Sequence, residues 1–383
     1  MQQRNRHFAG FLLCLKREKY FAIIHTRDYI KHTMKTLIQG ITFVLFVIFV
    51  NWQSLDASPL FDDQKILNAV LTAPLTQAYR EKKQQKRLWH QGQWAYTDKD
   101  GSTQRLDIAI RTRGISRRRN CSLPPLQLNF KKRQTKSTLF DGQDKVKLVS
   151  PCKNRNREQQ ELILEYLAYK SLEVLTDKAF KTRLLRLSYV DSEKRKKPWT
   201  HLTFVIESEK NLAKRLNFDM VHVPKINSSE LDPDHSALIE LFQLMIANND
   251  YSMIRGPANK NCCHNMELLK PKNTDLGIYP IPYDFDSNGL VNPEYAAPPE
   301  KLPIKDVRQR YFRGRCKPVE YWHKNISHIK SRQNEIMSIF QNSTELNSRY
   351  KSKTIRYLQK YFDILNDPKR IERDIIGRCL GKK

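Results

Sequence analysis

The sequence predicts an α+β protein of two lobes, a strand-rich lobe over residues 58–210 and a mainly helical lobe over residues 211–383. Alternating apolar and polar residues predict several short strands in the first lobe, with one long helical pattern among them. Helical spacing dominates the second lobe, and this order of elements fits two packed lobes. The chain has 383 residues, 39% of them hydrophobic, which is enough for a buried core.

Residues 1–57 form a basic segment around the apolar run ITFVLFVIFV at positions 41–50. A basic head, an apolar stretch and a following turn are the parts of a secretory signal. The run is shorter than the about 20 residues that span a bilayer. Either translation starts at Met34 and the segment is a signal peptide, or it is a signal anchor that contacts the membrane. Both predict that the rest of the chain is periplasmic, secreted or anchored outside the cytoplasm.

The formal charge of +28 favours polyanionic partners. The basic residues are scattered and include no aromatic-interleaved motif for nucleic acid, so no specific nucleic-acid partner is predicted. A soluble basic surface without a polyanionic ligand is the alternative.

An even number of cysteines follows the N-terminal segment, which in an exported chain predicts disulfides. We expect one between Cys121 and Cys152, and a second between Cys316 and either Cys262 or Cys263. The vicinal pair beside His264 also suggests soft metal ligands, but no CxxC spacing supports zinc. The six cysteines are Cys121, Cys152, Cys262, Cys263, Cys316 and Cys379.

In the first lobe, a helix is expected over residues 62–77, from the spacing of Ile66, Leu67, Val70 and Leu71. A second helix is expected from Gln159 to Leu175. Strands are expected at 106–111, 124–130, 145–149, 184–190 and 201–207.

Three polar residues of this lobe are candidates for binding phosphate. Lys147 lies on an expected strand and Glu165 on the following helix, as in the small lobe of a kinase, although many α+β domains share that pattern. Arg113 begins an arginine-rich loop over residues 113–119. Its guanidinium and backbone N–H groups suit phosphate, and a surface turn between strands is the alternative.

The central stretch, residues 241–292, predicts a helix that breaks before Asp250 and then a β-hairpin. Asn265 begins the first hairpin strand and Asp284 ends the second, so both are expected at the same end. An Asp, an Asn and an Asp that converge can hold Mg²⁺ and a nucleotide. The alternative is that they are ordinary turn residues, and His264 is interpreted as a capping or core residue.

Residues 284–289, DFDSNG, also match the first six positions of a calcium loop. Position 12 of that loop would be Tyr295, which lacks the bidentate carboxylate. A partial Ca²⁺ turn therefore remains as an alternative.

Several of these pieces together resemble the spore-coat CotH-type family. They are the RGIS element at residues 113–116 before the strand LQLNF, the strand end FVIE at 204–207, the Asn249-Asp250 pair, and the hairpin end YDFD at 283–286. The likeness covers about residues 105–290. It implies a protein-kinase-like fold and a secreted, atypical kinase that uses ATP and Mg²⁺ or Mn²⁺.

The resemblance also implies roles for individual residues. Asp250 would be the catalytic carboxylate, and Asn265 and Asp284 would bind the metal ion with help from Asp286. Asp250 and Asn265 lie 15 residues apart, whereas kinase catalytic loops place this pair five apart.

The function expected from the sequence is transfer of phosphate from ATP to a protein or another envelope acceptor. The alternative is a kinase-like envelope protein without catalysis that binds polyanions or Ca²⁺. No GxSxG, HExxH or P-loop motif occurs, so hydrolase, zinc-protease and Walker-type functions have no local support.

Overall fold

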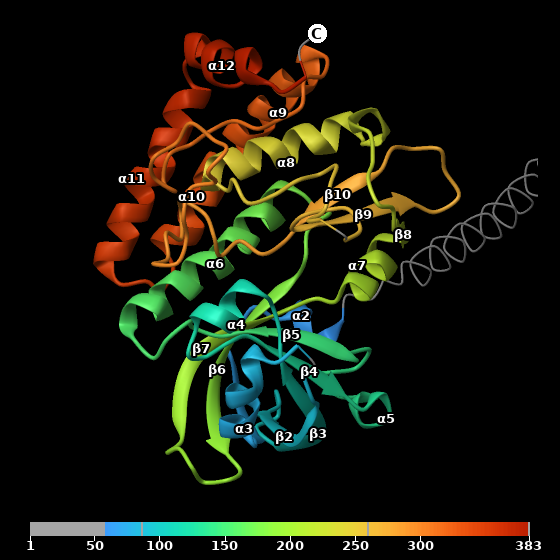
Figure 1. The fold of residues 1–383 in the computed structure, drawn as a ribbon, viewed down its shortest axis with the longest axis vertical. Coiled ribbons are helices and arrows are strands. Elements are labelled where there is room, and N and C mark those ends of the chain that lie inside the picture. Colours follow the sequence, from blue (N-terminus) through green and yellow to red (C-terminus); the bar gives the residue numbers. More distant parts are fainter. Residues whose placement is uncertain (1–57, 86, 259, 382–383) are drawn as a thin grey trace, which may run out of the picture. The chain divides into compact units, whose positions relative to one another are not determined.

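The computed structural model describes residues 58–381 apart from positions 86 and 259. The expected signal peptide or anchor within residues 1–57 lies outside the described residues. The described fold is α+β, with a closed barrel of seven strands in the N-terminal part and a mostly helical C-terminal region (Figure 1). The lobe boundary expected at residue 210 stays a prediction.

The barrel strands follow the order β1, β2, β3, β4, β5, β7, β6, and the ring closes where β6 pairs with β1. That last pair is parallel, and the other neighbours are antiparallel. The strands predicted from alternating residues are confirmed as β3 to β7. The seven strands are β1 (Leu67–Ala73), β2 (His90–Thr97), β3 (Thr103–Thr112), β4 (Leu126–Phe130), β5 (Lys145–Val149), β6 (Thr182–Asp191) and β7 (Trp199–Ile206).

The prediction of a helix over residues 62–77 is wrong for the central part of that range, which forms strand β1. Ala69, Leu71 and Ala73 face the barrel core, whereas Val70 between them is 37% exposed. This period of two, together with pairing to β2 on one side and β6 on the other, favours a strand.

One short helix precedes β1 and others connect the barrel strands, and one of them, α4, replaces part of the loop expected at residues 113–119. They are α2 (Pro59–Asp62), α3 (Leu75–Arg80), η1 (Glu81–Lys83), α4 (Ser116–Asn120) and α5 (Lys132–Thr135).

The long helix α6 (Asn156–Leu175) confirms the helix predicted in this part and lies between the barrel and the C-terminal helices (Figure 1). One hydrophobic core fills the barrel around Trp94 and Phe140. A second core runs from the outer barrel residue Phe204 through Tyr169 of α6 to the C-terminal helices. Because α6 contributes to this shared core, its polar side chains are fixed relative to the C-terminal region.

The C-terminal region contains a small antiparallel sheet of order β10, β9, β8 beside a group of helices. A new helix begins at Pro368, where the Asp367 side chain accepts hydrogen bonds from the N–H groups of Lys369 and Arg370. No helix in the described part of the chain is long and apolar enough to cross a membrane. The elements are α7 (Glu209–Leu216), β8 (Phe218–Met220), η2 (Ser228–Glu230), α8 (Pro233–Ile246), β9 (Met266–Pro271), β10 (Tyr279–Pro282), α9 (Val319–Ser331), α10 (Gln333–Gln341), α11 (Ser348–Leu365), α12 (Pro368–Asp374) and η3 (Ile376–Arg378).

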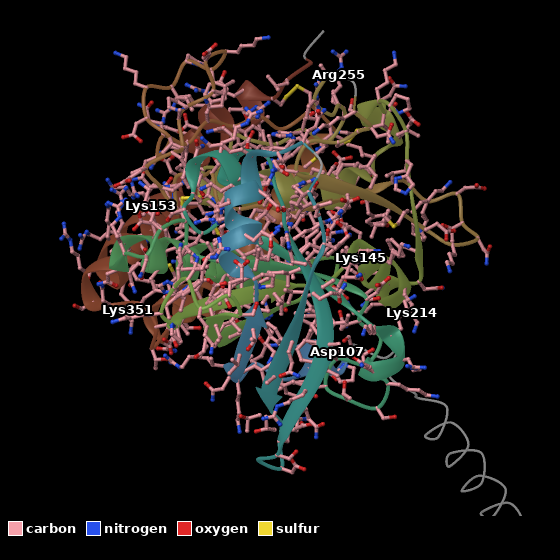
Figure 2. The ribbon with its side chains drawn as sticks, turned by 60° about the horizontal axis from the view of Figure 1, so that its bottom comes forward. Asp107, Lys145, Lys153, Lys214, Arg255 and Lys351 are labelled. Carbon is pink, nitrogen blue, oxygen red and sulfur yellow. A yellow bond between two sulfur atoms is a disulfide. The ribbon has the colours of Figure 1, made fainter. Side chains whose placement is uncertain are left out.

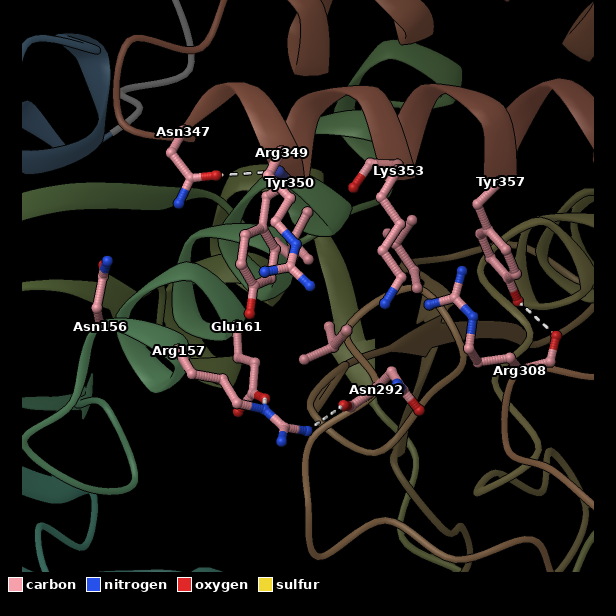
Figure 3. Close-up of a pocket in the computed structure, with 14 residues that line it drawn as sticks. Asn156, Arg157, Glu161, Asn292, Arg308, Asn347, Arg349, Tyr350, Lys353 and Tyr357 are labelled. Carbon is pink, nitrogen blue, oxygen red and sulfur yellow. Dashed lines mark hydrogen bonds and ion pairs between the residues drawn. The ribbon is translucent and has the colours of Figure 1, made fainter.

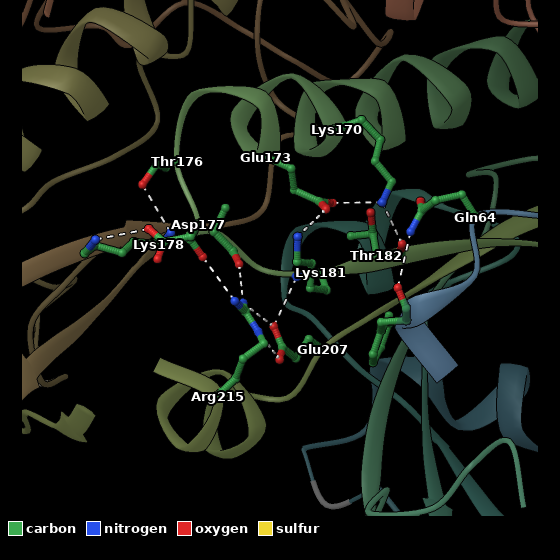
Figure 4. Close-up of polar contacts among 12 residues, drawn as sticks. Gln64, Lys170, Glu173, Thr176, Asp177, Lys178, Lys181, Thr182, Glu207 and Arg215 are labelled. Atoms are coloured by element: carbon green, nitrogen blue, oxygen red, sulfur yellow. Dashed lines mark hydrogen bonds and ion pairs between the residues drawn. The ribbon is translucent and has the colours of Figure 1, made fainter. Parts of the chain in front are cut away.

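A polar network fixes the connection between the barrel and α7 (Figure 4). Glu207, which follows β7, accepts hydrogen bonds from Arg215 Nε at 3.0 Å and Nη2 at 2.9 Å. Arg215 also donates to the carbonyl oxygens of Asp177 and Ala179, at 3.1 and 2.7 Å. Residues after β7 are thereby bound to the turn that follows α6.

The basic side chains are spread over the described surface, as the scattered sequence positions suggest. Figure 2 labels Lys145 on β5, Lys153 before α6, Lys214 on α7 and Lys351 on α11, which project from different parts of the fold.

Candidate functional site

The two ends of the β9–β10 hairpin meet beside the turn that follows α8. Met266 pairs with Pro282, so Asn265 and Asp284 lie at the same end, as predicted. The Tyr283 N–H donates to the Asn265 carbonyl oxygen at 3.1 Å. The fold therefore brings these two side chains together.

Asn265 and Asp284 both have left-handed backbones, with φ of 54° and 63°. Asparagine and aspartate tolerate this conformation better than most residues, but it still costs free energy. The Asp284 N–H donates to the Tyr169 hydroxyl of α6 at 2.9 Å. Phe285, which is fully buried, packs against Tyr169 and against Phe242 of α8, with ring centroids 4.5 and 5.4 Å apart. Contacts from two helices thus hold the unusual backbone in place.

Asp250 lies against the hairpin end, in contact with His264 and Asn265. His264 Nε2 is 2.7 Å from Asp250 Oδ1. Asn265 Nδ2 donates to the Asp250 carbonyl oxygen at 2.7 Å and to its Oδ2 at 3.3 Å. The Asp250 side chain is 49% exposed, so its carboxylate remains accessible.

The 15-residue separation of Asp250 and Asn265 does not keep them apart. Ser252 and His264 form an antiparallel bridge, with N–H···O distances of 3.0 and 3.1 Å in the two directions. This bridge closes the intervening segment into a loop and brings Asn265 next to Asp250.

The interpretation of His264 as a capping or core residue is wrong. Its side chain is 37% exposed and bonded to Asp250. That hydrogen bond raises the pKa of His264, partial burial opposes the shift, and the charges of Asp250 and Asp284 add to it. The sequence signal that could have identified it is its position directly before Asn265.

Arg313 holds the turn that contains Asp250. Its guanidinium donates to the carbonyl oxygens of Asn249 and Tyr251, the second at 3.2 Å. The guanidinium carbon also lies 5.3 Å from the centroid of the Tyr251 ring. These contacts give Arg313 a positioning role for the turn that contains Asp250.

A buried network lies next to the hairpin end and centres on Arg117 of α4. Arg117 Nη2 is 2.9 Å from Glu165 Oε2, and its Nε is 3.1 Å from Asp286 Oδ2. The Tyr295 hydroxyl donates to the same Asp286 oxygen at 2.7 Å. Arg117 was only one of several arginines in the sequence, and no local pattern distinguished it.

The expected pair of Lys147 and Glu165 is not formed. The ammonium of Lys147 contacts Glu209 and lies 4.8 Å from the centroid of the Tyr283 ring. Glu165 pairs instead with Arg117, because the disulfide from Cys121 to Cys152 ties the end of α4 to the segment just before α6.

Carboxylates outnumber cations around the hairpin end. Burial raises the pKa of Glu165, Arg117 opposes this shift, and the charges of Asp286 and Asp284 add to it. Burial and the neighbouring Asp284 likewise raise the pKa of Asp286, against the effect of Arg117. The charged forms of these neighbouring carboxylates therefore disfavour one another, and a bound cation would offset that repulsion.

At this end, side-chain oxygens of Asp284 and Asn265 have no protein partner in the described part of the chain. The Asp284 carboxylate makes no hydrogen bond or ion pair, and Asn265 Oδ1 is free because the Asn265 amide bonds through Nδ2. A carboxylate and an amide oxygen suit Mg²⁺ or Mn²⁺, which needs few protein ligands when phosphates supply others. Residues 58–381, as described, contain no group of three His, Cys, Asp or Glu side chains placed to hold a metal ion. Asp286 is engaged by Arg117 and Tyr295.

The calcium turn expected as an alternative fits the structure less well. Asn288, its fifth position, is fully buried. Its Nδ2 donates to the Phe285 carbonyl oxygen at 2.7 Å, and its Oδ1 accepts from the N–H groups of Leu290 and Val291. The side chain stabilises its own turn and does not face Asp284 as a ligand would.

One predicted disulfide is confirmed and the other is wrong. Cys121 bonds to Cys152 as expected. Cys316 bonds to Cys379, because the chain end pairs with the segment around Cys316 through N–H···O bonds of 2.8 and 3.0 Å at Leu380. Cys262 and Cys263 bond to each other, which removes them as zinc ligands.

Three disulfides in the described residues indicate an oxidising, extracytoplasmic location. No protein-family model and no curated protein matches this chain.

Proposed function

We propose that the protein is an exported, kinase-like enzyme that transfers the terminal phosphoryl group of ATP to a protein or another envelope acceptor. The observation that supports this most is the free oxygen pair of Asn265 and Asp284 beside the accessible Asp250. A strand barrel, with one long buried helix between β5 and β6, and a larger helical region after it also support a kinase-like, two-lobed architecture.

Asn265 and Asp284 would hold Mg²⁺ or Mn²⁺. The bound ion would neutralise charge on the phosphates during transfer. Arg113 is partly exposed and makes no side-chain hydrogen bond or ion pair with other described residues. Its charge acts on Tyr169 and Tyr283, which flank Asp284, and its guanidinium would contact phosphate oxygens.

Asp250 would orient the acceptor hydroxyl and accept its proton. The acceptor oxygen forms a bond to the γ-phosphorus, the bond from that phosphorus to the bridging oxygen breaks, and ADP leaves. His264 donates a hydrogen bond to Asp250 Oδ1 and Asn265 to Oδ2, which fixes the carboxylate. Lys147 would have a secondary role in binding phosphate, because Glu209 already neutralises its ammonium group.

The test is transfer of labelled γ-phosphate by the full-length protein, produced in an oxidising compartment, with Mg²⁺ or Mn²⁺. We expect labelling of the protein itself or of an added acceptor, and a loss of about 10²–10⁴-fold in Asp250→Ala. Asp275→Asn, an exposed change at the other end of the hairpin, is the matched control. Labelling that survives Asp250→Ala would contradict the assigned role.

A non-catalytic protein that binds polyanions is the second candidate, supported by the spread of basic side chains over the surface (Figure 2). Such binding would fall steeply with salt and would not change in Asp250→Ala.

A further inference from the structure

A cavity of about 490 Å³ lies away from the hairpin end, between the start of α6, residues 290–292 and the helix α11 (Figure 3). This volume is in the range of pockets that enclose small molecules. The cavity wall includes the apolar residues Leu164, Leu290 and Val291 and the rings of Tyr350 and Tyr357. It therefore offers surfaces for a carbon skeleton as well as for charged groups.

Cations outnumber carboxylates in this cavity. Arg157, Arg308, Arg349 and Lys353 line it, together with the single acidic residue Glu161. Arg157 pairs with Glu161 at 2.7 Å and with Glu294 at 3.1 Å. The other three cations form no ion pair with a described residue, and the carboxylate whose charge acts on Lys353 is that of Asp306, which does not line the cavity.

The cationic groups of Arg308, Arg349 and Lys353 make no hydrogen bond or ion pair with any residue that the structure describes. Figure 3 shows Arg349 and Lys353 extending from α11 toward the wall that holds Arg157 and Asn292. Partial burial lowers the pKa of Lys353, the charges of Arg308, Arg349 and Arg157 lower it further, and the charge of Asp306 opposes the shift. The cations are thus close enough to repel one another.

Arg308 is held in place without use of its N–H groups. Its guanidinium carbon lies 4.3 Å from the centroid of the Tyr357 ring, and the Tyr357 hydroxyl donates to the Arg308 carbonyl oxygen at 2.9 Å. The neighbouring Arg310, in contrast, donates to the carbonyl oxygens of Met245 and Tyr357 at 3.0 and 2.8 Å. A fixed guanidinium with free donors is suited to bidentate contact with a tetrahedral oxyanion.

We propose that this cavity binds a small molecule that bears at least two phosphate or sulfate groups. Three unpaired cations on two walls offer contacts to more than one anionic group, and a volume of about 490 Å³ suits a small molecule. Phosphate and sulfate esters share the tetrahedral, oxygen-rich chemistry that these cations recognise. The proposal does not depend on phosphoryl transfer, because none of the residues around Asp250 lines the cavity.

The experiment is calorimetric titration of the full-length protein with two probes, inorganic pyrophosphate and a trisulfated heparin disaccharide. EDTA is present throughout, so that binding of phosphate through a metal ion at Asp284 does not contribute. We expect one site for at least one probe, and the tighter probe identifies phosphate or sulfate as the natural group. The double variant Arg349→Ala/Lys353→Ala should weaken that site by about tenfold or more.

The matched control is Lys351→Ala/Lys360→Ala, which removes the same charge from the same helix at positions outside the cavity. It should keep the affinity within about twofold of the original. If the first double variant does not fold, Arg308→Gln provides the same test from the opposite wall. Equal weakening by both double variants, or no saturable binding of either probe, would overturn the proposal.

Discussion

Two polar regions of the described chain have opposite charge imbalances. Carboxylates exceed cations around Asp284, whereas cations exceed carboxylates in the cavity beside α11. Helix α6 contributes to both, through Glu165 at the first and through Arg157 and Glu161 at the second. Charges that are paired within the protein, as in the Arg117 network, stabilise the fold. The unpaired charges that remain in each region are the groups to which we propose that external ions bind.

The largest effect is expected from a substitution that removes the ion pairs of Arg117 with Glu165 and Asp286. Arg117→Met should lower the free energy of unfolding by about 3–5 kcal/mol, because Glu165 and Asp286 would remain buried without a cation. Chemical denaturation measures the change. Arg119→Met, an exposed change on the same short helix, should cost less than about 0.5 kcal/mol. A similar small cost for Arg117→Met would show that the network does not hold the site together.

A smaller effect is expected from the hydroxyl that supports Asp284. Tyr169→Phe removes the acceptor for the Asp284 N–H and should cost about 1 kcal/mol of stability. It should also weaken metal-dependent nucleotide binding, because the left-handed backbone loses one of its supports. Tyr166→Phe on the same helix is the control, since its hydroxyl makes no hydrogen bond in the described part of the chain. Equal effects of the two variants on nucleotide binding would argue against this support.

The smallest effect concerns the pH response of the cationic cavity. Burial raises the pKa of Glu161 to about 7, against the effect of Arg157, and the charges of Glu158 and Glu294 add to the rise. Glu161 is negative above this pH and neutral below it. The affinity of the cavity for the sulfated disaccharide should therefore rise by roughly threefold as the pH falls from 8 to 6. Sulfate does not titrate in this range, and Tyr350, which also faces Glu161, stays neutral because its pKa is raised. In Glu161→Gln the affinity should be almost independent of pH, and an unchanged pH response would assign the effect to another group.

The fold could be predicted from the sequence where one periodicity was clear. Strands β3 to β7 and the helix α6 follow from the alternation and the helical spacing of their residues. Strand β1 was missed because Leu67 and Leu71 satisfy either period, and only pairing with two distant strands decides between them.

The site could be predicted in part. A hairpin with Asn265 and Asp284 at one end follows from local sequence, since register fixes which ends meet. The partner of Glu165 could not be predicted from local sequence. Arg117 lies 48 positions earlier in the chain and reaches Glu165 only through the packing of α4. The pairing of Cys316 with Cys379 also depends on where the chain end packs, which no spacing reveals.

The central claim is that Asp284 and Asn265 hold the metal ion of a nucleotide complex. The most direct measurement is calorimetric titration of the full-length, disulfide-bonded protein with ATP, with Mg²⁺ or Mn²⁺ and then with EDTA. The account predicts one site that requires the metal ion, is weakened about tenfold or more in Asp284→Asn, and is unchanged in Asp275→Asn. No binding of ATP with either metal ion, or equal binding by Asp284→Asn, would contradict it.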